Sequence, residues 1–234
     1  MKHRTKQTIR RLPVVGGLAA RVYKRFAHFP GSQRYWEERY AASGDSGDGS
    51  MGRLAAFKAS VVNSFVADNG VLSVIEFGCG DGLQLALADY PSYIGLDVSP
   101  TAIKLCKDRF INDSTKSFFL YDTECFVDHA GVFRADLALS IDVLFHVTED
   151  EVFDSYMAKL FASSERYVVV YSSNFDEQQD FHVKHREFTR WVDSHAADWE
   201  LVQRIKNPYP YDPHDPKNTS PCDFYIFERR MAKE

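Results

Sequence analysis

A glycine-rich turn is the most specific feature of the sequence. The apolar segment Val74–Phe77, interrupted only by Glu76, runs directly into Gly78-Cys79-Gly80-Asp81-Gly82. Glycines let the backbone approach a ligand where a side chain would collide, so the turn predicts a ligand site at the end of a strand. A dinucleotide fingerprint would require a third glycine at position 83, which is leucine, and this argues against a nicotinamide cofactor.

Two more carboxylates follow predicted strands. Asp97 ends Tyr93-Ile94-Gly95-Leu96-Asp97, and Asp122 follows Phe119-Leu120-Tyr121. An ionised carboxylate only accepts hydrogen bonds, and therefore suits hydroxyl or amino donors. Each residue alone could be a helix cap or a turn former. Ligands of open parallel sheets, however, lie at the carboxyl ends of the strands, so the three features predict one shared site.

The G-x-G-x-G spacing, with an acidic residue two positions before the first glycine, resembles the first motif of class I S-adenosylmethionine-dependent methyltransferases. The resemblance covers about residues 54–229. It implies that Asp97 accepts hydrogen bonds from both ribose hydroxyls, that Asp122 contacts the adenine amino group, and that Glu76 faces the methionine ammonium group. The cofactor would be S-adenosylmethionine, and the residues expected to bind it are Glu76, Gly78, Cys79, Gly80, Gly82, Asp97, Val98, Asp122, Thr123 and Ser140.

The resemblance also places acceptor contacts in the segment Ser140–His146. Asp142 and His146 are four residues apart and would share a face if this segment were helical. An alcohol is a poor nucleophile that benefits from a general base, so we predict His146 as the base and Asp142 as the group that orients it or the acceptor. The reverse assignment stays open, as do a packed histidine and a helix cap.

Candidate acceptor-binding residues follow the fifth predicted strand. His182, His185 and Arg186 could bind a phosphate or a sugar acid, since arginine can bind such groups through two parallel hydrogen bonds. Tyr211 lies in a proline-rich loop that could cover the acceptor. The alternatives are a solvated basic patch and a rigid surface loop. No acidic or cysteine partner stands at a diagnostic spacing from the histidines, so we expect no metal site.

The elements that must position these residues alternate as in an α/β sheet. Five parallel strands are predicted at Val71–Phe77, Tyr93–Leu96, Ser117–Tyr121, Ala135–Ser140 and Arg166–Tyr171, with two further strands at Glu200–Ile205 and Asp223–Glu228. Helices are predicted from Leu54 to about Asn69, over Thr101–Phe110 and Asp150–Ala162, and around Phe188–His195. The predicted fold is a doubly wound, seven-stranded, mostly parallel sheet with an antiparallel last strand, of the Rossmann-like methyltransferase type.

Three regions are predicted along the chain: a basic arm at 1–34, an aromatic and Gly/Ser-rich lid segment at 35–53, and the methyltransferase domain at 54–234. Residues 1–36 carry nine basic side chains and no acidic one, whereas residues 37–234 have a net charge of −14. Any attraction to a polyanion therefore belongs to the arm, and we expect no nucleic-acid partner. The arm is expected to be solvated or to contact a membrane surface.

Four cysteines without paired spacing fit a reducing compartment, so we expect a cytoplasmic protein, with peripheral contact at the inner face of the membrane as the alternative. A second resemblance, carried by residues 34–58 and 209–219, is to small methyltransferases encoded among surface-polysaccharide or capsule biosynthesis genes. It implies a sugar or glycan-biosynthesis intermediate as the acceptor. Methylation of another small metabolite and a non-catalytic cofactor-binding scaffold stay open as alternatives.

Overall fold

The computed structural model describes residues 29–230. The chain divides into two units, Met1–Pro30 and Gly31–Glu234. Most of the predicted basic arm therefore lies outside the described residues. The predictions that the arm is solvated or contacts a membrane surface lie outside them as well. The second unit begins with helix α3 (Ser32–Ala41), which starts two residues before the predicted end of the arm. No helix between residues 29 and 230 is long and apolar enough to cross a membrane.

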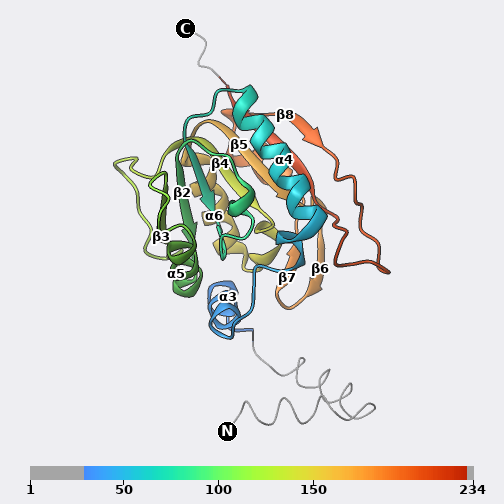
Figure 1. Ribbon diagram of the computed structural model, residues 1–234. Coiled ribbons are helices and arrows are strands. Elements are labelled where there is room, and N and C mark those ends of the chain that lie inside the picture. Colours follow the sequence, from blue (N-terminus) through green and yellow to red (C-terminus); the bar gives the residue numbers. More distant parts are fainter. Residues whose placement is uncertain (1–28, 231–234) are drawn as a thin grey trace, which may run out of the picture. The chain divides into compact units, whose positions relative to one another are not determined.

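A seven-stranded sheet forms the centre of the second unit (Figure 1). Its strands are β1 (Val74–Phe77), β2 (Tyr93–Asp97), β3 (Lys116–Leu120), β4 (Ala135–Ile141), β5 (Ser164–Ser172), β8 (Trp199–Ile205) and β9 (Asp223–Arg229). They lie in the order β3-β2-β1-β4-β5-β9-β8, and β1 to β5 are parallel. Because β9 is antiparallel to both neighbours, β8 points the same way as β1 to β5. The predicted fold class is confirmed.

Helices cover both faces of the sheet (Figure 1). Helices α4 (Gly52–Asp68) and α5 (Pro100–Arg109) pack on one face, and α6 (Asp150–Ala162) and α7 (Phe188–His195) pack on the other. Helix α5 begins as the sequence predicts, because the Ser99 hydroxyl accepts the Ala102 N–H and Pro100 occupies the first turn. Each face of the sheet packs against its helices through an apolar core. The strand order reverses between β1 and β4, which lie side by side in the middle of the sheet.

The structure differs from the prediction at several places. Strand β1 begins at Val74 instead of Val71, because the Val71 N–H closes the end of α4 on Val66 and the next two N–H groups donate to the Asp136 carboxylate. The elements that the prediction lacked are α3, the short 3₁₀ helices η1 (Asp48–Ser50), η2 (Leu85–Leu87) and η3 (Leu144–His146), and the hairpin strands β6 (Glu177–Asp180) and β7 (Val183–His185). Each is short or mainly polar, and so lacks the hydrophobic periodicity on which the prediction rests.

Candidate functional site

The glycine turn after β1 has the backbone that its sequence predicts. Gly78, Gly80 and Gly82 all have positive φ angles, of 84°, 59° and 76°. A Cβ atom at Gly78 would lie 2.5 Å from Val143, and one at Gly80 would lie 2.5 Å from the Ser46 hydroxyl. Side chains are therefore excluded here by conformation as well as by space, and the turn presents bare backbone at the reversal of the strand order.

Asp97, at the end of β2, is buried beside this turn. Its Oδ2 atom accepts the Gly80 N–H at 2.8 Å, and its Oδ1 atom accepts the Ser99 N–H at 2.9 Å. Burial raises the pKa of Asp97 to about 6, against the lowering effect of these two N–H groups. Each carboxylate oxygen has a second lone pair, so the side chain retains capacity for further donors.

Glu76 lies in the same layer, inside β1. The Tyr93 hydroxyl donates to its Oε2 atom at 2.6 Å. Burial raises the pKa of Glu76 to about 7, although the hydrogen bond from Tyr93 and the charge of Lys58 both lower it. A cation or a strong hydrogen-bond donor next to such a buried carboxyl group lowers its pKa and so favours the ionised form.

The other predicted cofactor residues are less uniform. Asp122 accepts the N–H groups of Glu124 and Cys125, both at 2.9 Å, and these bonds hold its pKa below the usual range. It is thus a turn former, with its side chain partly exposed. Ser140 is completely buried against the Tyr156 hydroxyl, at 2.8 Å. Of the remaining three, Cys79 is buried, Val98 packs against the core, and the Thr123 carbonyl accepts a hydrogen bond from Lys159.

The segment predicted as a lid lies against the ends of β1 and β2. Glu37, on α3, accepts hydrogen bonds from the Ser99 hydroxyl at 2.6 Å and from the Thr101 N–H and hydroxyl at 3.1 and 2.7 Å. Ser46 donates its N–H and its hydroxyl to Asp81, and the Tyr40 hydroxyl lies 3.0 Å from the Ser46 hydroxyl. No local sequence pattern indicates the roles of Glu37 and Ser46, because their partners Ser99 and Asp81 lie 62 and 35 residues away.

Asp142 and His146 do not share a helical face, so that expectation is wrong. Asp142 follows β4 with a positive φ of 58°, and only residues 144–146 form a 3₁₀ turn. Its carboxylate pairs instead with Lys58, Nζ to Oδ2 at 2.5 Å. The left-handed conformation, which Asp tolerates better than most residues, interrupts the chain at the strand end, so no regular helix runs from Asp142 to His146.

His146 is held by its Nδ1 atom, which lies 3.2 Å from the His182 carbonyl oxygen. A carbonyl only accepts, so Nδ1 carries the hydrogen and Nε2 has the free lone pair. Burial lowers the pKa of His146 to about 3, against the raising effect of the bond to His182. The ring packs edge-on to Trp36, with centroids 4.9 Å apart, and against Phe145, with centroids 4.5 Å apart. His146 is therefore a neutral imidazole of fixed tautomer.

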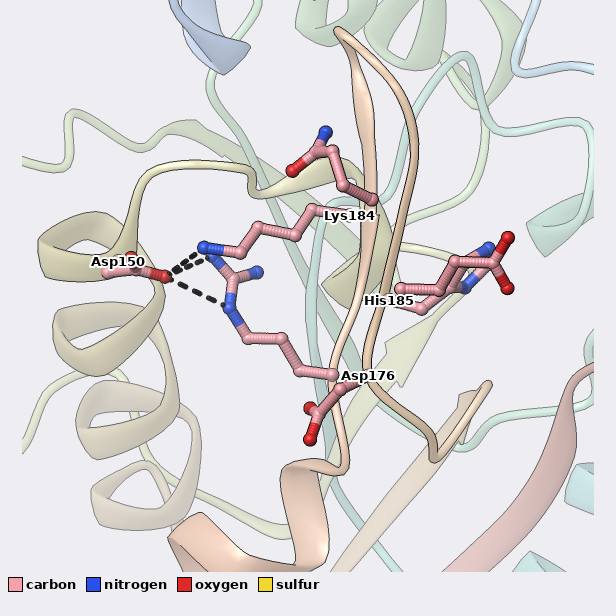
Figure 2. A pocket seen from close by; sticks show the side chains of 7 residues that line it. Asp150, Asp176, Lys184 and His185 are labelled. Carbon is pink, nitrogen blue, oxygen red and sulfur yellow. Dashed lines mark hydrogen bonds and ion pairs between the residues drawn. The ribbon is translucent and has the colours of Figure 1, made fainter.

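The predicted anion-binding residues are occupied by protein partners. Arg186 donates to the carbonyls of Val147 and Thr148 at 2.6 and 2.9 Å and, together with Lys184, to Asp150 (Figure 2). His185 points away from this cluster in Figure 2. Its two ring nitrogens lie 2.6 Å from the Ser173 hydroxyl and from Gln179 Oε1. These contacts favour a structural role for Arg186 and His185.

The remaining predicted residues fall in two places. His182 stacks on His146 with nearly parallel rings, 6.0 Å between centroids. The Tyr35 ring also packs on His182, with centroids 4.8 Å apart. Tyr211 is half exposed on the loop after β8, which Arg53 ties to α4 through the Asn218 carbonyl. Within residues 29–230, no group of three His, Cys, Asp or Glu side chains could hold a metal ion.

Residues 75–170 match a family model described as a methyltransferase domain. The matched stretch runs from β1 into β5 and contains the glycine turn, Asp97 and the segment from Asp142 to His146. This stretch is a methyltransferase domain, and it lies in a sheet of the class I, S-adenosylmethionine-dependent type. Among curated protein sequences, none matches the chain significantly.

Three solved structures with the same fold are distant from this chain in sequence. The N-methyltransferase NodS from Bradyrhizobium japonicum WM9, crystallised with S-adenosylhomocysteine, aligns with a TM-score of 0.63 at 15% identity, over 85% of this chain and 98% of NodS. The magnesium protoporphyrin IX methyltransferase ChlM from Synechocystis PCC 6803 gives 0.58 at 14% identity, over 84% and 97%. The methyltransferase domain of bacterial CtHen1 gives 0.59 at 20% identity, over 74% and 97%. At these identities the likeness establishes the fold.

The residues of the methyltransferase fit S-adenosylmethionine. Asp97 stands at the strand end next to the glycine turn, with lone pairs for the ribose hydroxyls. Glu76 is the nearby buried acid suited to the ammonium group. When bound, the cofactor supplies an electrophilic methyl group on a sulfonium.

Cofactor affinity should depend on pH through Glu76 and Asp97. Because their pKa values are raised, both carboxyl groups are partly protonated in the free protein. In the bound state they face an ammonium group and hydroxyl donors, so they must release these protons when the cofactor binds. Affinity should thus rise as pH rises through 6 to 7, and we expect up to about a hundredfold weaker binding at pH 5.5 than at pH 7.5. Calorimetric titration with S-adenosylmethionine measures this. The Glu76→Gln variant, which cannot titrate, should show a shallower dependence, and an equal slope in both proteins would contradict the assignment.

Proposed function

We propose that this methyltransferase methylates a hydroxyl group of a sugar or glycan-biosynthesis intermediate. The observation that carries the proposal is the neutral imidazole of His146, whose Nδ1 hydrogen is fixed on the His182 carbonyl. It follows the end of β4, next to the reversal of strand order where ligands of such sheets bind. A hydroxyl acceptor needs a group that can take its proton, and Nε2 has the lone pair for this.

The surroundings of His146 suit a sugar ring. Tyr35 and Trp36 from α3 pack on His182 and His146, with ring centroids 4.8 and 4.9 Å apart. Trp36 also packs on Tyr40, whose hydroxyl lies beside Gly80 in the cofactor turn. Aromatic walls with a few polar groups are typical of small-molecule sites. A sugar presents apolar C–H faces and hydroxyl groups, and both find partners here.

The reaction would be an in-line displacement in which the acceptor oxygen forms a bond to the methyl carbon as the bond from carbon to sulfur breaks. His146 would accept the hydroxyl proton at Nε2. A base with so low a pKa takes the proton late, once the attacking oxygen has become strongly acidic through its new bond to carbon. Burial then favours release of that proton to water, which returns the neutral imidazole.

A screen for methyl transfer tests the proposal. The purified enzyme is incubated with radiolabelled S-adenosylmethionine and a panel of nucleotide sugars and phosphorylated glycans. Label in a sugar product that withstands mild acid as an ether supports the proposal. Label transferred only to amines or to non-sugar metabolites would favour the alternative of a methyltransferase of other metabolism. Cofactor binding without transfer to any class of acceptor would favour a scaffold.

We also propose a cytoplasmic location with contact between the N-terminal arm and an anionic membrane, and no nucleic-acid acceptor. The net charge of −14 over residues 37–234 repels nucleic acid, whereas the nine basic residues within 1–36 attract anionic lipid.

Deletion of residues 1–25 should reduce flotation with vesicles of phosphatidylserine and phosphatidylcholine at low salt by severalfold, because this segment carries eight basic side chains and no acidic one. Vesicles of phosphatidylcholine alone are the control. Equal flotation of both proteins would leave the arm as a solvated segment.

A further inference from the structure

Lys58 is a buried charge that the cofactor site does not use directly. It lies on the inner side of α4 with 1% of its side chain exposed, and it is the one buried lysine among residues 29–230. Its Nζ atom contacts Asp142 Oδ2 at 2.5 Å and lies 5.4 Å from the centre of the Tyr171 ring. Burying an ammonium group costs several kcal/mol unless its partner is well placed, so the position of Asp142 is essential to this arrangement.

Asp142 is fixed from three sides. Its backbone N–H donates to the Tyr171 carbonyl at 3.0 Å, and its φ of 58° directs the side chain across to α4. Gly49 packs so closely that a Cβ atom there would lie 2.9 Å from Asp142 Oδ2. The side chain is still 21% exposed, and Lys58 makes the only side-chain hydrogen bond to its carboxylate among the described residues.

We propose that Lys58 is a positioning residue that holds one oxygen of Asp142 so that the other oxygen can orient the acceptor. The inference rests on the proposed function, because it assigns Asp142 to the acceptor side of that same site. The difference in burial between the two side chains supports this proposal, since Lys58 is buried and Asp142 is partly exposed to solvent. A pair serving stability alone needs no such opening, and apolar side chains would serve stability equally well.

The first arm of the test needs no acceptor. Hydrogen exchange over residues 141–146 is measured by mass spectrometry in the cofactor-bound wild type and in Lys58→Met, which keeps an unbranched side chain of similar length but removes the charge. Exchange should speed up at least about tenfold in Lys58→Met and return toward the wild-type rate in Lys58→Arg. Lys107→Met, at an exposed position of α5, is the matched control and should match the wild type. Unchanged protection in Lys58→Met would overturn the positioning role, whatever the acceptor is.

The second arm uses an acceptor found by the sugar screen. Lys58→Met should lower kcat about tenfold and raise the acceptor KM, because a misplaced group loses alignment. Affinity for S-adenosylmethionine should stay within about threefold when it is measured at a pH well above 7, because Glu76 is then ionised without help from the Lys58 charge. Equal loss of cofactor affinity and turnover would indicate a purely structural role and overturn the proposal. If Lys58→Met does not fold, Asp142→Asn, which keeps a hydrogen-bonding partner for Lys58, must show the same kinetic pattern. A screen that finds no sugar acceptor defeats the proposed function, and the exchange arm still reports on Lys58.

Discussion

Replacing His146 with alanine should lower methyl transfer by about 10²- to 10⁴-fold, the usual contribution of a general base, while cofactor affinity stays within about threefold. The imidazole contacts Trp36, Phe145 and the His182 carbonyl, and none of these is a predicted cofactor residue. The loss should therefore appear in the rate of the chemical step. Single-turnover transfer with saturating cofactor measures that rate directly.

The pH profile gives a second test of His146. An ordinary histidine would give a rate that falls below about pH 6.5. Burial lowers the pKa of His146 to about 3, so its imidazole stays neutral across the accessible range and wild-type kcat should show no acid limb from this residue between pH 5 and 8. His129→Ala, at an exposed histidine of the loop before β4, is the control and should keep the wild-type rate. A His146→Ala enzyme with the wild-type rate would return this residue to a packing role.

The fold-losses in methyl-transfer rate caused by His146→Ala and by Asp142→Asn should multiply in the double variant. Asp142 binds Lys58 and His146 binds the His182 carbonyl, so the two side chains belong to separate hydrogen-bond networks. Independent sites give additive free energies, whereas residues that act as one unit do not. A double variant His146→Ala/Asp142→Asn that is no worse than the worse single variant would reinstate the direct pairing that the sequence spacing suggested.

The local signals in the sequence predicted most of the sheet and the backbone of the glycine turn. Ser99-Pro100 predicted the start of α5, and the glycines at 78, 80 and 82 predicted a turn with positive φ angles. These features act over a few neighbouring residues, and their physical meaning changes little with tertiary context. The strand directions followed as well, because parallel strands separated by helices leave few arrangements.

The acceptor half depends on contacts that no local pattern encodes. Lys58 and Asp142 are 84 residues apart, and Lys58 lies in a helix where a lysine is ordinarily solvent-exposed. Helix α3 buries only Ser32 and Tyr40, so it shows no apolar face. It is held in place by polar contacts, through Glu37 to the start of α5 and through Ser32 to Glu149. The positive φ of Asp142 breaks the helical geometry that would have placed Asp142 and His146 on one face.

Replacing Asp97 with alanine should weaken S-adenosylmethionine binding by about tenfold to hundredfold, or roughly 1–3 kcal/mol. Two effects act together. The ribose hydroxyls lose a charged acceptor, and the Gly80 and Ser99 N–H groups lose the carboxylate that holds the glycine turn against the start of α5. The second effect makes the turn less ordered before the cofactor arrives, so part of the loss should appear as a less favourable entropy of binding.

Calorimetry separates these effects with two further variants. Asp97→Asn keeps one carbonyl acceptor and a similar volume, so it should recover part of the turn but bind more weakly than the wild type, because it lacks the charge that strengthens hydrogen bonds to the ribose. Asp108→Ala removes an exposed carboxylate from α5 and should leave the affinity unchanged. If Asp97→Ala bound as tightly as Asp108→Ala, Asp97 would be a structural link between the turn and α5 with no contact to the ribose.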